Sequence, residues 1–226
     1  MINTLFQSKI YVIGMSNMTE KSADNQNATS QTVFIVDDDP AIRFAMQALM
    51  DSVNIEHEIF ASADEFLQNE EQHRSGCLVL DIRMPGLGGL ELQEELISRG
   101  STLPIIFITG HGDVPMAVDA MQKGAVDFIQ KPFRDQELLD RVREALMTDK
   151  ERREERERHA EVEHRLEKLT KREREVFDLV VTGKPNKVIA YELGVSQRTV
   201  EIHRARVMEK MRARSLADLV RMHMSL

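Results

Sequence analysis

Short apolar runs alternate with helical segments between Thr32 and Asp149. Five strands are predicted, at Val33–Val36, Ile55–Phe60, Cys77–Leu80, Ile105–Ile108 and Phe128–Ile129. Five helices are predicted, at Pro40–Ser52, Ala63–Gln68, Gly89–Ser98, Pro115–Lys123 and Asp135–Asp149. Strands that alternate with helices in this way indicate an α/β fold, in which a five-stranded, doubly wound parallel sheet is covered by helices on both faces.

The next segment, Lys150 to Ala160, has almost no apolar residues. Glu154 and Arg158 stand four positions apart, a spacing that supports a helix, so we expect the preceding helix to continue as a semi-rigid spacer. A flexible segment is the alternative. A coiled coil is disfavoured because no apolar residue takes an a or d position before Val162.

From Leu169 the pattern is wholly helical. Thr170 and Glu173 form a capping box that opens a first helix, and a second helix is predicted at Asn186–Leu193, before a turn at Gly194. Ser196 caps a third helix whose inward positions are Val200, Val207 and Met211. Two helices joined through a glycine turn, with a basic outer face, are what insertion into the DNA major groove requires.

These patterns predict four parts of the chain: a disordered tail (1–30), an α/β domain (31–149), a charged helical linker (150–168) and an all-α helix-turn-helix domain (169–226). The tail is rich in Ser, Thr, Asn and Gln, and Met15 or Met18 could be the true start. Cys77, the single cysteine, allows no intramolecular disulfide and lies in an apolar strand, as a packed thiol would. A single packed thiol fits a reducing cytoplasm. No run reaches membrane-span length, so we also expect no membrane association.

The charge is divided unevenly along the chain. Residues 31–149 contain 9 Lys or Arg against 22 Asp or Glu, whereas residues 170–226 contain 12 against 7. An acidic half joined to a basic half indicates a metal site in the first and a polyanionic partner for the second.

Polar residues follow four of the predicted strands. Asp37 and Asp38, Asp81, Thr109 and Lys131 can meet because the carboxyl ends of parallel strands share one crevice. The group suits phosphoryl transfer to Asp81. Asp37 and Asp38 would hold Mg²⁺ beside it, while Lys131 and Thr109 offer a positive charge and a hydroxyl to phosphoryl oxygens. The peptide before Pro132 could be cis and so aim Lys131.

Four segments, Val33–Asp39, Leu80–Gly86, Ile108–Gly110 and Asp127–Phe133, resemble in order and spacing the receiver domain of bacterial two-component response regulators. The resemblance covers residues 32–149 and implies a flavodoxin-like fold. It also implies that Asp81 is the phosphoacceptor and that Asp38 and Asp81 bind the metal together with the backbone carbonyl of Arg83. Asp37 would act largely through water.

The resemblance places Thr109 and Phe128 at the switch positions of the family. Phosphorylation there draws the threonine toward the phosphoryl group and turns the aromatic ring inward, which repacks the face formed by the fourth helix and fifth strand. Arg83 and His111 fall where the family tunes the lifetime of the phosphoryl group.

Simpler roles exist for each residue. Asp39, before Pro40, is expected to cap a helix. Thr109 alone could be an ordinary strand residue, and Phe128 alone a core residue.

An enzymatic function is an alternative, since some phosphohydrolases form an aspartyl phosphate, but they need a second acid or base and a substrate pocket that the sequence does not indicate. A third reading is a helical domain that binds RNA or protein, although the sequence has no Trp and two Tyr for base stacking.

The C-terminal part resembles the LuxR-type helix-turn-helix through Leu169–Val176, Asn186–Ala190, Leu193–Ser196 and Arg198–Arg204. Together the halves resemble a FixJ/NarL-type regulator, and Thr109–Val118 favours the FixJ branch. By position, Glu201, Ile202 and Ala205 would face base edges, and the full set of expected DNA contacts is Lys187, Arg198, Thr199, Glu201, Ile202, Arg204, Ala205 and Arg206.

Two of these positions differ from NarL-like members, which have lysine where this chain has Glu201 and Ala205, so we expect a different base preference. The carboxylate of Glu201 could accept a hydrogen bond from the N4 amino group of cytosine, or it could form an ion pair with Arg198 or Arg204 instead. Any single Arg or Lys could also simply solvate a helix face. Arg172 and Arg174 are expected to be structural.

The combined interpretation is a phosphorylation-dependent transcriptional regulator rather than an enzyme, apart from phosphotransfer to itself and autodephosphorylation. The resemblance implies a sensor histidine kinase as phosphate donor, Mg²⁺ as cofactor, double-stranded promoter DNA as ligand, and RNA polymerase as a further partner. A homodimer formed on phosphorylation is expected because two recognition helices spaced by one turn of DNA raise affinity and specificity.

Overall fold

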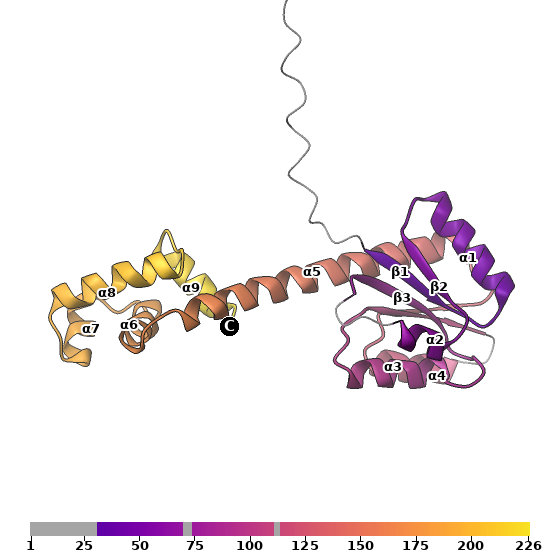
Figure 1. The fold of residues 1–226 in the computed structure, drawn as a ribbon, viewed down its shortest axis with the longest axis horizontal. Coiled ribbons are helices and arrows are strands. Elements are labelled where there is room, and N and C mark those ends of the chain that lie inside the picture. Colours follow the sequence, from indigo (N-terminus) through magenta and orange to yellow (C-terminus); the bar gives the residue numbers. More distant parts are fainter. Residues whose placement is uncertain (1–30, 70–73, 111–113) are drawn as a thin grey trace, which may run out of the picture. The chain divides into compact units, whose positions relative to one another are not determined.

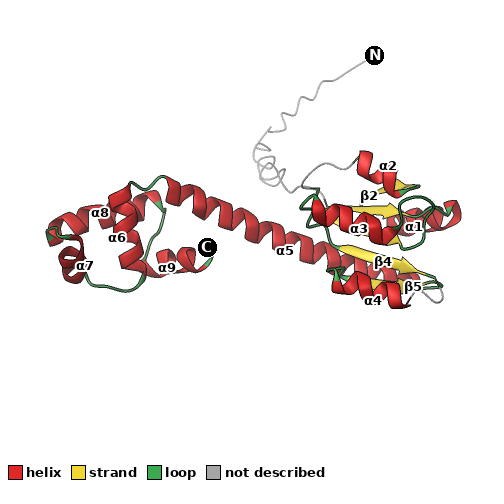
Figure 2. Cartoon of the chain, turned by 90° about the horizontal axis from the view of Figure 1, so that it is seen from below, coloured by secondary structure: helices red, strands yellow, loops and turns green. Residues whose placement is uncertain are grey.

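The computed structural model describes residues 31–69, 74–110 and 114–226 of the 226-residue chain (Figure 1). The predicted tail (1–30) and His111 lie outside the described residues. The first part of the described chain alternates strands and helices in the order β1 (Thr32–Val36), α1 (Pro40–Ser52), β2 (His57–Phe60), α2 (Ala63–Gln68), β3 (Gly76–Asp81), α3 (Gly89–Ser98), β4 (Ile105–Thr109), α4 (Val114–Gln122) and β5 (Asp127–Gln130). The remainder is helical, with α5 (Asp135–Glu167), α6 (Lys171–Val181), α7 (Asn186–Leu193), α8 (Gln197–Lys210) and α9 (Leu216–Met224) (Figure 2).

The five strands form one parallel sheet in the order β2-β1-β3-β4-β5, which confirms the predicted doubly wound fold. The strand order changes direction between β1 and β3, and in open α/β sheets this switch point is where a crevice opens at the carboxyl ends of the strands. Asp37 directly follows β1 and Asp81 ends β3. The topology therefore brings the two carboxylates to the same crevice.

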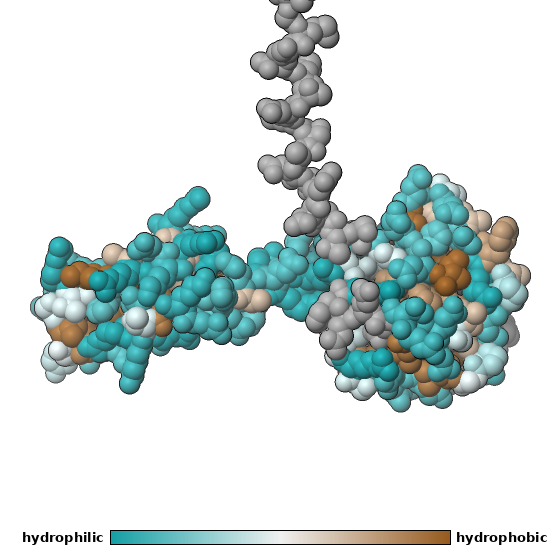
Figure 3. All heavy atoms as spheres, viewed as in Figure 1, coloured by the Kyte–Doolittle hydropathy of each residue, from teal (hydrophilic) through white to brown (hydrophobic). Residues whose placement is uncertain are grey.

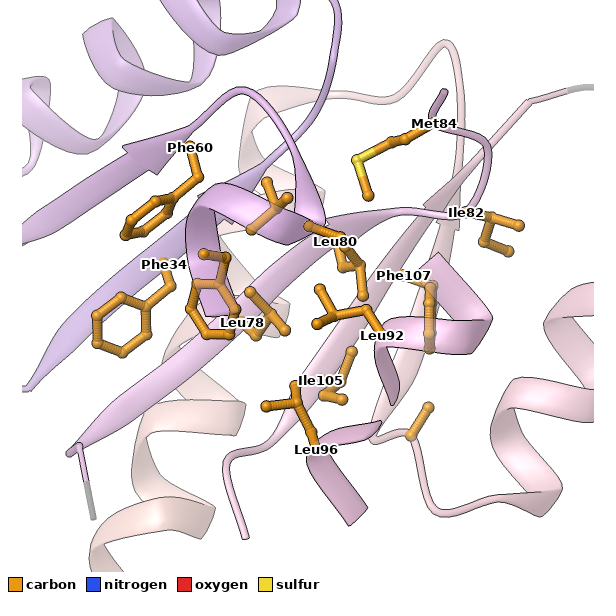
Figure 4. Packing of buried hydrophobic residues seen from close by; sticks show 14 of the residues in the cluster. Phe34, Phe60, Leu78, Leu80, Ile82, Met84, Leu92, Leu96, Ile105 and Phe107 are labelled. Carbon is orange, nitrogen blue, oxygen red and sulfur yellow. The ribbon is translucent and has the colours of Figure 1, made fainter. Parts of the chain in front are cut away.

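Each face of the sheet is covered by helices, and consecutive strand residues point to opposite faces. Phe34, Leu78, Leu80 and Phe107 pack with helices α2 and α3 on one face, and Figure 4 shows Leu92 and Leu96 of α3 among them. On the other face, α1 and α5 contribute the buried residues Met46, Met50, Leu138, Leu139, Val142 and Ala145. Strands buried on both faces explain why β3 is apolar from Cys77 to Leu80.

Cys77 is fully buried, as predicted for a packed thiol. Burial away from water raises the pKa of its thiol, and the nearby Asp149 carboxylate raises it further. A protonated, enclosed thiol has little nucleophilic character.

Local capping chemistry sets several helix boundaries. Asp39 precedes Pro40, and its Oδ1 accepts a hydrogen bond from the backbone N–H of Ala41 at 2.8 Å, which confirms its predicted role as the cap of α1. Predicted bounds of several strands and of α4 differ from the structure by one residue, and the start of β2 differs by two. Strand β2 begins at His57 rather than Ile55, because Asn54 adopts a φ of 53° and the N–H of Ile55 still bonds to the carbonyl of Met50 in the turn after α1.

Helix α5 extends for 33 residues and contains residues 150–167 of the predicted linker (150–168), so the preceding helix does continue. Its exposed charges form a hydrophilic surface along the middle of the helix (Figure 3). Near its end, Val162 and Leu166 are buried with residues of α6 to α9. The last turns of α5 therefore belong to the packing of the helical domain.

The helical domain packs around Val200 and Val207 of α8 and Met211 directly after it, the three residues predicted to point inward. Thr170 and Glu173 form the predicted capping box at the start of α6. The final helix, α9, was not predicted, although Ser215 caps it by accepting from the N–H of Asp218. No helix in the described ranges is long and apolar enough to cross a membrane.

Candidate functional site

Three carboxylates meet at the carboxyl edge of the sheet. One oxygen from each of Asp37, Asp38 and Asp81 lies within 4.8 Å of the others. Asp37 is 1% exposed and Asp81 is 9% exposed, whereas Asp38 is open to solvent. Such a set of hard oxygen donors, partly buried and open on one side, suits a divalent cation such as Mg²⁺ that keeps several waters.

Lys131 lies between two of these carboxylates. Its Nζ donates to Oδ2 of Asp37 at 2.9 Å and to Oδ2 of Asp81 at 2.8 Å. The peptide between Lys131 and Pro132 is cis, as the sequence suggested. Lys131 comes from the end of β5, so the predicted convergence of distant strand ends on one crevice is found in the structure.

The electrostatics of the site follow from burial and pairing. Burial raises the pKa of Asp37, because its hydrogen bonds with Lys131 and the Asp39 N–H only partly offset the loss of hydration. Burial acts to lower the pKa of Lys131, but its hydrogen bonds to Asp81 and Asp37 outweigh this and raise it. Lys131 is therefore a stable positive charge beside Asp81.

Backbone contacts hold the acidic loops in place. The N–H of Arg83 donates to Oδ1 of Asp81 at 3.3 Å, and the N–H of Asp39 donates to Oδ1 of Asp37 at 2.8 Å. Arg43 also donates from Nη1 to the carbonyl of Asp37 at 2.7 Å. Sequence reasoning missed Arg43, although its position one turn into α1, four residues after Asp39, could have indicated it.

The two expected switch residues differ in their relation to this group: the carbonyl of Thr109 accepts a hydrogen bond from the backbone N–H of Lys131 at 2.7 Å. Thr109 is buried at the end of β4, and its hydroxyl donates to the carbonyl of Gly110 at 2.9 Å. Phe128 is 38% exposed on β5, so its ring lies outside the core. Neither side chain has a hydrogen bond or ion pair with Asp81 within the described part of the chain.

A second candidate site is the outer face of α8. Arg198, Glu201, Ala205 and Arg206 are exposed there, and Ile202 is 44% exposed. Arg198 pairs with Glu201, its Nη1 lying 3.4 Å from Oε2, which is one of the alternatives that the sequence left open.

Other predicted contact residues are engaged within the domain. Arg204 is half-buried and donates from Nη1 to Oδ1 of Asn186 at 3.1 Å, and Thr199 shares a hydrogen bond with the capping residue Ser196. Lys187 is exposed on α7. Arg204 therefore links α8 to α7, and the other predicted residues are exposed or half-buried on these two helices.

The two arginines expected to be structural do have partners within the domain. Arg172 donates from Nη2 to the carbonyl of Leu193 at 2.5 Å and pairs with Glu175. Arg174 pairs with Asp178, and its guanidinium lies 5.6 Å from the ring centre of Phe177.

Comparison with known proteins assigns both parts of the chain. Residues 33–143 match the family described as response regulator receiver domain, and residues 167–223 match bacterial regulatory proteins of the luxR family. Nodulation protein W of Bradyrhizobium diazoefficiens is 52% identical over 86% of this chain and 86% of its own length.

The chain is a response regulator of the FixJ/NarL type. The transcriptional regulatory protein FixJ of Rhizobium meliloti is 45% identical to this response regulator over 86% of the chain and 95% of its own length. Among solved structures, the response regulator StyR superimposes with a TM-score of 0.80 at 45% identity, covering 87% of this chain and 100% of its own. Full-length FixJ from B. japonicum gives a TM-score of 0.56 at 40% identity, covering 87% and 97%. The protein thus combines a receiver domain with a LuxR-type DNA-binding domain, as regulators of transcription controlled by phosphorylation do.

Proposed function

We propose that this response regulator accepts a phosphoryl group on Asp81 from a sensor histidine kinase and then binds promoter DNA as a homodimer. The observation that carries this proposal is the meeting of Asp37, Asp38, Asp81 and Lys131 at one edge of the sheet. The parts are a tail (1–30), a receiver (31–149), a linker (150–168) and a DNA-binding domain (169–226).

The chemistry of transfer follows from these residues. An oxygen of the Asp81 carboxylate attacks the phosphorus of a phosphohistidine, and the phosphorus–nitrogen bond breaks with its electron pair passing to the imidazole nitrogen. Asp38 and Asp81, the carbonyl of Arg83 and, through water, Asp37 would hold Mg²⁺. When bound, Mg²⁺ neutralises the carboxylates and screens their repulsion of the incoming phosphate.

Lys131 already contacts Asp81, so its ammonium group is placed to bind a phosphoryl oxygen on that residue. The hydroxyl of Thr109, now bonded to Gly110, would exchange that partner for another phosphoryl oxygen. Movement of Thr109 vacates space that the exposed ring of Phe128 can enter. The repacked surface of α4 and β5 would carry the signal to the rest of the protein.

In the DNA-binding domain, α8 would enter the major groove. Glu201, Ile202 and Ala205 would face base edges, while Lys187, Arg198, Thr199, Arg204 and Arg206 would contact phosphates or support those that do. Arg204 would need to release or share its bond with Asn186 to reach a phosphate. RNA polymerase is the proposed further partner, and the cytoplasm is the compartment in which kinase and promoter are both accessible.

The test is intact-mass spectrometry of wild type, Asp81→Asn and Asp39→Asn after incubation with acetyl phosphate and either Mg²⁺ or EDTA. We expect the wild type to gain one phosphoryl group from acetyl phosphate in the presence of Mg²⁺ and none in EDTA. Asp39→Asn should behave in the same way, because Asn can still cap α1. Asp81→Asn should gain none. A phosphoryl group on Asp81→Asn would place the acceptor elsewhere.

A further inference from the structure

Tyr191 is an unusually exposed aromatic residue on α7. Its side chain is 88% exposed, more than any other large hydrophobic side chain among the described residues. Among the described residues, the hydroxyl of Tyr191 has no hydrogen-bond partner. An aromatic ring this exposed makes little contact with its own domain, so its apolar face and its hydroxyl are both available to a ligand.

The neighbours of Tyr191 show which side of α7 it occupies. Ile189 and Ala190 are buried and pack the helix against the rest of the domain. Lys187 precedes Tyr191 by four residues, so the two side chains lie along the same strip of the helix, away from the packed side. Lys187 is exposed and forms no ion pair with any described residue, whereas Lys184 is held by both oxygens of Glu192 at 2.8 Å.

The strip on α7 is held in a defined position relative to α8. Gly194 ends α7 with a φ of 64°, and Arg204 of α8 donates to Asn186 at the start of α7. In a helix-turn-helix the second helix enters the major groove while the first crosses the sugar–phosphate backbone. A lysine and a tyrosine on the exposed strip of the first helix then face phosphates, for which both residue types are common donors.

We propose that Tyr191 binds the phosphodiester backbone of duplex DNA, with its hydroxyl donating to a phosphate oxygen beside the phosphate that Lys187 contacts. This inference rests on the proposed DNA-binding function and adds a contact to it. The neighbouring ammonium of Lys187 favours an anionic ligand over a protein. A protein partner would typically bury about 800 Å² on each side, and this strip offers one ring and the partly exposed Val188.

A phosphate contact predicts a specific behaviour, because Tyr191 is neutral. Its hydrogen bond should strengthen binding to any duplex sequence without releasing counterions, so it should not alter the salt dependence of binding. Lys187 carries a charge, and its removal should lower the slope of log affinity against log salt by about 1.

The experiment measures fluorescence anisotropy of a labelled mixed-sequence duplex with the full-length protein, incubated with Mg²⁺ and acetyl phosphate, over a range of salt concentrations. Tyr191→Phe removes only the hydroxyl and Lys187→Gln removes only the charge. Met224→Ala, at an exposed position on α9, is the control and should bind as wild type does. We expect Tyr191→Phe to bind about five- to tenfold more weakly at every salt concentration, with an unchanged slope.

Each other result overturns the inference in a recognisable way. If Tyr191→Phe binds as wild type does while Lys187→Gln shows a lower slope of log affinity against log salt, the hydroxyl of Tyr191 does not donate to a phosphate and the inference is wrong. If the wild-type protein binds no duplex at any salt concentration, the proposed function fails and this contact fails with it.

Discussion

The carboxylate of Asp149 accepts a hydrogen bond from the backbone N–H of Gly76 at 2.9 Å, joining α5 to the first residue of β3. Asp149 is 1% exposed, and it also accepts from the hydroxyl of Ser75 at 3.0 Å and from the side-chain amide of Gln31 at 3.4 Å. Strand β3 ends at Asp81. The same strand thus connects the candidate phosphoacceptor to the point where α5 is fixed to the receiver.

Replacing Asp149 with Ala should lower the free energy of unfolding of the receiver by about 2–4 kcal/mol, since it leaves buried donors at Gly76 and Ser75 without an acceptor. Urea denaturation followed by circular dichroism measures the change. Asp140→Ala is the matched control on the same helix, because Asp140 is exposed, and its cost should stay within about 0.5 kcal/mol. Equal midpoints for the two variants would show that the Asp149 network contributes little.

Magnesium should stabilise the receiver, because the proposed site forms only when folding brings the three carboxylates together. For a dissociation constant of about 1 mM, about 10 mM Mg²⁺ adds about 1.4 kcal/mol to the free energy of unfolding. Asp38→Asn should lose most of this increment while folding normally in EDTA, since Asp38 is exposed. Asp39→Asn should keep it. If Mg²⁺ raised the free energy of unfolding of Asp38→Asn as much as that of the wild type, Asp38 would not be a metal ligand.

Lys131→Gln should slow labelling of Asp81 by acetyl phosphate at least about tenfold, equivalent to about 1.4 kcal/mol in the barrier. The reason is loss of the ammonium group that contacts Asp81 and would bind the phosphoryl oxygen. Mg²⁺ should still raise the free energy of unfolding of Lys131→Gln, which would distinguish the role of Lys131 from that of the metal ligands. Lys123→Gln serves as a control because Lys123 pairs only with Glu94 and Asp119 in the described structure, on the surface. Labelling of Lys131→Gln at the wild-type rate would contradict the proposal.

Sequence alone predicted the elements whose ends are set by neighbouring residues. Helices α1, α2 and α3 have the expected bounds, and Asp39 and Ser62 cap the first two through contacts within three residues. The start of β2 was predicted wrongly because apolar residues such as Ile55 can serve in a helix-ending turn as well as in a strand. Helix α9 was missed although Ser215 and Asp218 supplied a local starting signal.

Some features of the candidate site could be predicted from the sequence and others could not. The meeting of the acidic residues with Lys131 follows from the rule that parallel strands end at one edge, so it was predictable. The hydrogen bond from Thr109 to Gly110 depends on a rotamer, which spacing along the chain does not determine. Asp149 was also missed, because it stands among many charged residues of α5 and its partner Gly76 is 73 positions away.

Acid should weaken the helical domain through Glu173. This carboxylate is 2% exposed and lies beside Lys210 and the N–H of Thr170. Burial acts to raise the pKa of Glu173, but the hydrogen bonds from Lys210 and Thr170 outweigh it and lower the pKa to about 2, from an ordinary value of 4.5. A depressed pKa in the folded state contributes stability that is fully present above pH 4.5 and is lost as the pH falls toward 2.

Hydrogen exchange measured by mass spectrometry on peptides from α6 and α8 can isolate this effect from the receiver. Glu173→Gln removes the charge, so at pH 6 its peptides should exchange faster than those of wild type. Near pH 3 the difference should shrink, because the wild-type carboxylate has by then lost part of its contribution. Glu175→Gln, a half-exposed neighbour on α6, is the control and should show a smaller difference that changes less with pH. A Glu173→Gln difference as large at pH 3 as at pH 6 would mean that packing and not charge makes Glu173 important.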